Sequence, residues 1–86
     1  MVLPNEKLDG SIVIASSYMN EDEQVVVLLN PEAPFFSIAY VAGFRATRVH
    51  SESNFVGAAT AYIQFGGDPS TYDDVARAME NAEVGR

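Results

Sequence analysis

The chain has 86 residues, 48% of them hydrophobic, with 12 acidic and 5 basic side chains, a formal net charge of −7 and no cysteine. This length supports a single domain, and the missing cysteines exclude disulfides and thiolate metal sites. So few Lys and Arg side chains argue against binding to a nucleic-acid backbone or to an anionic membrane surface. The hydrophobic content is too high for a disordered chain, so we expect one folded domain over residues 1–86.

The first ten residues, MVLPNEKLDG, are polar, contain a proline and end in Asp-Gly. This composition predicts a loose or edge-lying N-terminal arm over residues 1–10. The arm lacks the basic and apolar parts of a secretion signal, and no apolar run in the chain approaches the roughly 20 residues of a membrane span. We therefore expect a cytoplasmic protein.

Three β-strands are predicted in the first half of the chain. Alternating side chains predict a strand over residues 11–19, and after a polar turn a β-branched run predicts a second over 24–30. Two prolines then interrupt the chain before a third strand over 35–42, so their segment is a connection between antiparallel strands. A bulge or bend is expected at Gly43, and residues 44–50 alternate as a fourth strand or as a continuation of the third.

Two helices are predicted in the last third of the chain. Ser51 is the expected N-cap of the first, apolar residues recur at helical spacing over 55–62, and the Gly-Gly pair at 66–67 is the expected left-handed C-cap. The Asp-Pro-Ser run at 68–70 is expected to start the second helix, and the tail over 83–86 is expected to fray. The predicted fold class is α+β: a small antiparallel sheet of three to four strands followed by two C-terminal helices packed on one face, β-β-β-(β)-α-α.

Two segments of the chain, RVHSESNFVGAATAYIQFGGD and VVVLLNPEAPFF, together resemble small uncharacterised proteins encoded by actinobacterial phages. In those proteins a short sheet runs into a helix with an aromatic residue near its end. The resemblance covers about half of the chain, and its motifs are structural: a helix cap, a helix stripe and a Gly-Gly stop. It implies a phage accessory protein that acts on a host component, and it carries over no catalytic residue.

The sequence offers little catalytic, metal-binding or cofactor chemistry. Glu52 could orient His50, the single histidine, as a general base, but a polar residue at the end of a strand is the simpler interpretation. The acidic residues 21–23 are consecutive, so they cannot converge on one metal ion. The glycines at 66–67 follow a helix and have no Lys after them, unlike a phosphate-binding loop. We therefore expect no catalytic residue, no metal ligand and no cofactor.

Both faces of the predicted sheet are apolar, because side chains alternate between faces and the second and third strands are apolar at successive positions. Two short helices cover one face. The other would need a second copy of the chain, the N-terminal arm folded across it, or a host or phage protein. Among these we expect a homodimer. The candidate interface residues are Val26, Leu28, Phe36, Ile38 and Tyr40.

The expected function is a non-enzymatic protein–protein interaction module: a homodimeric, phage-type accessory protein that acts on an unidentified host or phage protein. One alternative is an acidic nucleic-acid mimic that blocks a DNA-binding protein, for which the carboxylates would have to line one face. A second alternative is a small enzyme centred on His50, and a third is a structural subunit of a larger assembly. Neither nucleic acid nor a membrane is expected as a partner.

Overall fold

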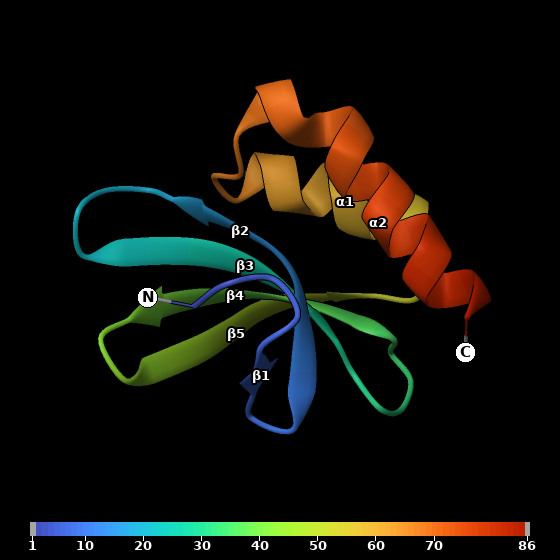
Figure 1. The fold of residues 1–86 in the computed structure, drawn as a ribbon, viewed down its shortest axis with the longest axis horizontal. Coiled ribbons are helices and arrows are strands. Elements are labelled where there is room, and N and C mark those ends of the chain that lie inside the picture. The colour runs from blue at the N-terminus through green and yellow to red at the C-terminus, as the bar shows by residue number, and fades with distance from the viewer. Residues whose placement is uncertain (1, 86) are drawn as a thin grey trace.

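The computed structural model describes residues 2–85, which form a sheet of five strands followed by a pair of helices (Figure 1). The strands lie side by side in chain order, and each pairs antiparallel with the next. They are β1 (Lys7–Leu8), β2 (Ser11–Tyr18), β3 (Glu23–Leu29), β4 (Phe36–Ala42) and β5 (Arg45–Glu52). The α+β class is confirmed, and the sheet has five strands where three to four were predicted.

A tight turn makes β5 a separate strand instead of a continuation of β4. Ala42 pairs with Arg45, so only Gly43 and Phe44 lie in the turn. Gly43 has a φ of 61°, a value that glycine reaches without the steric cost other residues meet. The sequence signal at Gly43 therefore marks a hairpin turn, and the Phe44 side chain at its tip is fully exposed.

The N-terminal arm contains the short strand β1 and is bound to the sheet. The Asn5 amide donates to the Val13 carbonyl over 2.7 Å, and the Val13 amide donates to the Glu6 carbonyl over 2.8 Å. The buried Gln24 side chain bonds both backbone groups of Val2, at 2.9 and 3.0 Å. Of the two forms predicted for residues 1–10, the described part of the arm is the edge-lying one and is not loose, because its backbone groups find partners on the sheet. Residue 1 lies outside the described residues.

The helices are α1 (Phe55–Gln64) and α2 (Tyr72–Val84), and the 3₁₀ turn η1 (Pro69–Thr71) precedes α2. Helix α1 begins after the predicted position, because Ser51 continues β5 and the Asn54 side chain caps the helix by accepting the Gly57 amide at 3.0 Å. No helix among residues 2–85 is long and apolar enough to cross a membrane.

The glycine pair at 66–67 ends α1 as predicted. Gly66 has a φ of 118°, and its amide donates to the Ile63 carbonyl over 3.2 Å, while the Gly67 amide donates to the Tyr62 carbonyl over 2.8 Å. These are the two bonds of a Schellman motif. At the other end, α2 continues through 83 and 84, where fraying was predicted; residue 86 lies outside the described part of the chain.

The second helix starts later than predicted. The Asp68 carboxylate accepts the Ser70 amide at 3.0 Å and the Ser70 hydroxyl at 2.8 Å. These bonds hold the residues that follow in the tighter η1 turn, so the α-helical pattern begins only at Tyr72. The predicted capping signal at 68–70 is therefore real, but it caps a 3₁₀ turn.

The face of the sheet toward the helices, called here the outer face, forms the larger core. Figure 1 shows both helices packed on this one side of the sheet. Small side chains on α1 let the helix approach the strands closely, so little space is left between the two layers. The buried members of this outer cluster are Ala15, Val25, Val27, Phe36, Ile38, Ala58, Ala59, Ala61, Tyr62, Val75 and Met79.

The opposite face, called here the inner face, is enclosed by the curl of the sheet and by the arm. Arg48 on β5 reaches across to the start of the sheet, donating to the Asp9 carboxylate at 3.3 Å and to the Ser11 hydroxyl at 3.0 Å. The inner cluster consists of Val13, Val26, Leu28, Ala39 and Val41, with Val2, Leu8 and Ala46 packed against it. A single chain thus covers both of its apolar sheet faces.

Candidate functional site

The five residues predicted as an interface lie in the core and do not share one face. Val26 and Leu28 belong to the inner cluster, Phe36 and Ile38 belong to the outer cluster, and Tyr40 packs against the outer one. The first four side chains are at most 1% exposed. The predicted interface is therefore corrected. The helices cover the outer face, where Phe36, Ile38 and Tyr40 lie, and the curl and the arm cover Val26 and Leu28 on the inner face.

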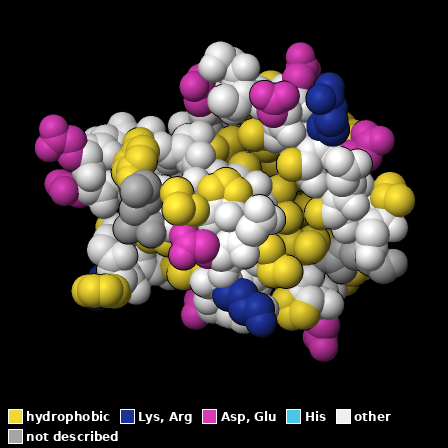
Figure 2. Space-filling view, viewed as in Figure 1, with side chains coloured by type: hydrophobic (Ala, Val, Ile, Leu, Met, Phe, Trp, Pro, Cys, Tyr) yellow, Lys and Arg dark blue, Asp and Glu magenta, His cyan; other side chains and the backbone are white. Residues whose placement is uncertain are grey.

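An apolar groove of about 230 Å³ lies between β2 and α2. Figure 2 shows hydrophobic side chains gathered in a hollow near the centre of this face of the molecule, with carboxylates at separate places around it. The groove is open because residues along its helical wall, such as Thr71 of η1 and Ala78 of α2, have short side chains. Its lining consists of Pro4, Ile14, Ala15, Ser16, Tyr62, Thr71, Asp74, Val75 and Ala78.

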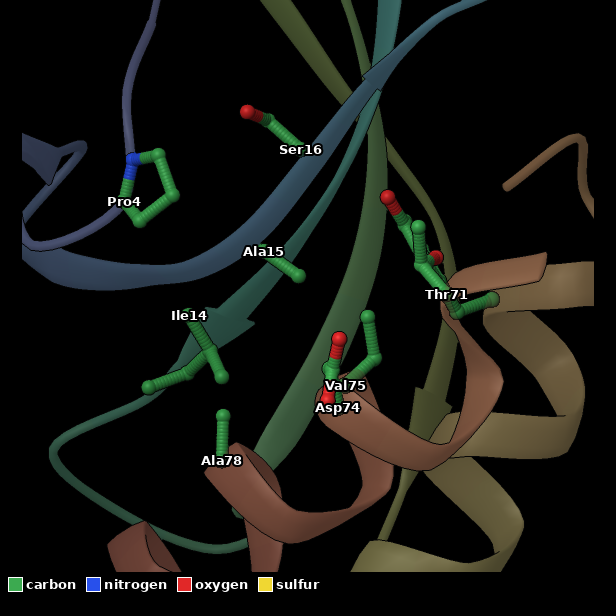
Figure 3. Close-up of a pocket in the computed structure, with 9 residues that line it drawn as sticks. Pro4, Ile14, Ala15, Ser16, Thr71, Asp74, Val75 and Ala78 are labelled. Atoms are coloured by element: carbon green, nitrogen blue, oxygen red, sulfur yellow. The ribbon is translucent and has the colours of Figure 1, made fainter. Parts of the chain in front are cut away.

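The groove follows the edge of β2 and includes both sides of that strand. Figure 3 shows Ala15 pointing from β2 toward α2, whereas Ser16 points the other way, toward the side where Pro4 of the arm lies. This arrangement agrees with the burial pattern, in which Ala15 belongs to the outer cluster and Ser16 pairs with Val26 of the inner one. The groove therefore runs along the edge of β2 and is lined by residues from both faces of the strand.

The strand edge in the groove has no partner strand. β1 pairs with Ser11 and Ile12, and the arm bonds Val13. Within the described chain, residues 14–18 have no strand beside them on the side of β2 that faces away from β3. The N–H and C=O groups of such an edge are a template for another strand. Five residues of open edge span about 17 Å, the length of a typical strand.

A bulge determines which backbone groups of β2 point into the groove. The Val13 amide and carbonyl both point away from β3, toward the arm. The register then shifts at Ile14, which adds one residue and reverses the alternation. The Met19 amide accordingly points toward β3 and donates to the Glu23 carbonyl at 2.9 Å. Because this direction alternates along a strand, the residues of the open edge whose amides point away from β3 are Ser16 and Tyr18.

The other edge of the sheet, β5, is also unpaired but carries features that discourage strand addition. Arg45 and Arg48 place charge along it, and the register shifts between Ile38 and Ala39, so that the bulge falls within β5 at Val49. Charged side chains and bulges are the usual protection of a sheet edge. The open part of β2, with the sequence Ile-Ala-Ser-Ser-Tyr, has no charged residue and no proline.

The electrostatics of the groove are negative. Asp74 is the only charged residue in its lining, and within the described chain no ion pair or hydrogen bond engages the Asp74 carboxylate. Asp68 lies near the Tyr18 end of the open edge, where its amide donates to the Ser17 hydroxyl over 3.4 Å. Hydrogen bonds from the Ser70 amide and hydroxyl hold the pKa of the Asp68 carboxyl below its ordinary value.

A hydrogen bond between the Ser17 and Tyr62 hydroxyls ties β2 to the end of α1. Burial raises the pKa of the Tyr62 phenol, the Ser17 hydrogen bond lowers it by less, and the Asp68 carboxylate adds a further increase. Gly67 is required beside this ring, because a Cβ at that position would lie 2.6 Å from two Tyr62 ring carbons. Tyr62 is thus a neutral, structural residue that fixes the floor of the groove.

The candidate base His50 does meet Glu52, as the sequence suggested for the enzyme alternative. The His50 Nε2 and Glu52 Oε2 atoms are 2.6 Å apart, and the His50 ring lies 5.4 Å from that of Phe65. Neither residue lines the groove at β2 or the smaller hollow of about 100 Å³ near the hairpin tips. The pair therefore has the geometry of an oriented histidine, and it lies outside these two hollows.

The acidic turn at 21–23 lies at the end of the β2–β3 hairpin and contributes to the smaller hollow. Asn20 organises the turn by accepting the Asp22 and Glu23 amides at 2.8 and 3.0 Å. Residues 2–85 contain no group of three or more His, Asp or Glu side chains placed to hold a metal ion. The three acidic residues of this hairpin end are exposed to solvent.

Comparisons with protein families, curated proteins and solved structures found no match to this chain. The resemblance to phage-encoded proteins stays a prediction.

Sequence reasoning missed the residues of the groove, although it placed the strand and the helix that form it. The sequence carried one usable signal, since residues 14–18 lack the charges and prolines that protect an edge strand. That signal had no meaning until β2 was known to lie near an edge. Position in the sheet is a long-range property, because β1 covers only the first part of β2.

Proposed function

We propose that this protein is a non-enzymatic interaction module that binds an extended segment of another protein by strand addition to β2. The observation that carries the proposal is that residues 14–18 form an unpaired and uncharged strand edge, of which residues 14–16 line an apolar groove beside α2. In this binding mode main-chain hydrogen bonds supply affinity, and pockets for alternate side chains supply specificity. The resemblance to phage accessory proteins supports a host or phage protein as the source of the segment.

The groove takes the place of the sheet face as the binding surface. A homodimer was expected because one apolar face lacked a cover, and the arm and the curl now provide that cover. A second copy could still pair through β2, so the oligomeric state is an outcome of the tests below. The nucleic-acid mimic gains less support, because Figure 2 shows the carboxylates at separate places around this face and not in a row.

Two proline variants test the proposal at matched positions on the two sheet edges. Ser16→Pro removes an amide of β2 that points away from β3. Ser51→Pro removes the corresponding amide of the other edge strand, β5, at the position paired with Ser37 of β4. Proline is tolerated at edge positions whose amide faces solvent, so both variants should fold, as circular dichroism and thermal unfolding would verify. Peptides would be selected on the native chain from a displayed random library and then synthesised.

We expect the selected peptides to bind Ser16→Pro at least about tenfold more weakly than the native chain, because a ladder hydrogen bond is lost and the ring obstructs pairing. Ser51→Pro should bind them as the native chain does. If Ser16→Pro does not fold, Ala78→Gln serves instead, because it fills the groove from an exposed helix position. Equal binding by all variants, or a library that yields no binding peptide, would refute strand addition at β2.

A further inference from the structure

The charges around the groove indicate what kind of segment it accepts, on the basis of the function proposed above. We infer that the occupant is a cationic extended segment with small or medium apolar side chains at alternate positions, supplied by another protein and not by a second copy of this chain. The apolar positions would lie over the groove floor, and the Lys or Arg positions would flank them.

One carboxylate lies in the groove wall, and two further acidic residues lie near the ends of the open edge. Asp74 lines the wall and is not engaged by any residue of the described chain. Asp68 lies at the Tyr18 end, and at the other end Glu6 is held next to β2 by the bond between its carbonyl and the Val13 amide. Among residues 2–85, no Lys or Arg lines the groove. The Asp74 carboxylate also stabilises α2, because it lies in the first turn, at the positive end of the helix dipole. Its effect on binding therefore has to be measured separately from its effect on stability.

The same charges disfavour a second copy at this edge. Each chain carries a formal charge of −7, so pairing two chains brings like charges together. In a two-fold β2–β2 pairing centred on Ser16, the sheet continues in one plane and both α2 helices lie on the same side of it. The two Asp74 carboxylates would then lie on that side as well, close to the shared edge. A cationic segment instead neutralises them and associates faster through electrostatic attraction.

The dimensions of the groove set the length and pattern of the segment. The open edge spans residues 14–18, so about five residues of a partner strand can pair with it. Side chains of an added strand alternate between the α2 side, where Ala15 and Val75 lie, and the Pro4 side. The short side chains along α2 leave room for valine or threonine more readily than for a large aromatic ring.

Two capped, fluorescent peptides with the same core test the inference: Lys-Lys-Val-Thr-Val-Lys-Lys and Glu-Glu-Val-Thr-Val-Glu-Glu. Binding to the native full chain would be measured by fluorescence anisotropy at low and high salt. We expect the lysine peptide to bind at least about tenfold more tightly than the glutamate peptide, and added salt to reduce this difference. Asp74→Asn should weaken the lysine peptide by about threefold, and Asp73→Asn, on the same helix turn but outside the groove lining, by less.

The outcomes distinguish this inference from the proposed function. If both peptides bind equally and Ser16→Pro abolishes both, the charge preference is wrong and strand addition holds. If library peptides bind at β2 but neither lysine nor arginine is enriched in them, the inference fails alone. If light scattering shows a native dimer that Ser16→Pro converts to a monomer, the occupant is a second copy and the inference is overturned. If no peptide of any kind binds, both proposals fail.

Discussion

The two edges of the sheet differ in how they treat exposed backbone. The β5 edge carries Arg45 and Arg48, contains a bulge, and leads directly into the turn before α1. The β2 edge is covered by β1 and the arm over its first part and then left bare, without charge, beside an apolar groove. An unpaired edge is therefore informative about function only when it lacks the usual protections against strand pairing.

The largest expected effect on stability comes from the covered part of the β2 edge. Leu8→Ser removes a half-buried side chain that packs on the inner cluster, and we expect the free energy of unfolding to fall by about 2 kcal/mol. Lys7→Ser introduces serine at the neighbouring, exposed position and should change the free energy of unfolding by less than about 0.5 kcal/mol. Urea unfolding of both variants measures the difference, and equal effects would show that the arm does not contribute to the core.

A smaller effect is expected where the open part of β2 joins α1. Tyr62→Phe removes the hydroxyl that bonds Ser17, which should cost about 1 kcal/mol of unfolding free energy. Ser17→Ala should cost a similar amount, and the double variant should cost less than the sum, because both single changes break the same bond. Additive losses in this double-mutant cycle would show that the two hydroxyls are not coupled.

The same tyrosine gives the unfolding free energy a pH dependence with a definite sign. Burial raises the Tyr62 pKa above its ordinary value of 10.0, so the unfolded chain loses this proton at a lower pH than the folded chain does. The stabilisation is fully present below pH 10.0 and is lost as the pH rises through that value toward the folded pKa. We expect stability to decline less steeply above about pH 10 in Tyr62→Phe than in the native chain. Parallel declines would contradict the assignment.

The smallest expected effect concerns the β5 edge. Arg48→Met breaks the bonds to Asp9 and Ser11 that hold the curl, but both charged side chains are partly exposed, so we expect a loss of only about 0.5 kcal/mol. The loss should decrease in high salt, because solvent screens exposed pairs. Arg45→Met, at the same edge without an ion pair in the described chain, should have no measurable effect. A similar loss for both variants would mean that charge alone, and not the contact across the curl, matters.

Local features of the chain could be predicted because they depend on neighbouring residues. The strands over 11–18 and 23–29 follow from alternation and β-branched residues, and the Gly-Gly end of α1 follows from the conformational freedom of Gly66. Cap positions were less predictable, because Ser51 and Asn54 are both good N-cap residues. Only the pairing of Ser51 with Ser37 in the sheet selects Asn54.

The α+β class, the order of the strands before the helices, and the surplus of apolar residues on both sheet faces follow from the amino-acid sequence alone. What covers the second face depends on contacts that form only in the folded chain. The arm and the curl enclose Val26 and Leu28, and the exposed apolar surface appears instead at the edge of β2. Side-chain alternation is set residue by residue, whereas curl and edge position depend on contacts between distant segments, such as Arg48 with Asp9. A periodic pattern therefore reveals that a face is apolar, but not which part of the chain covers it.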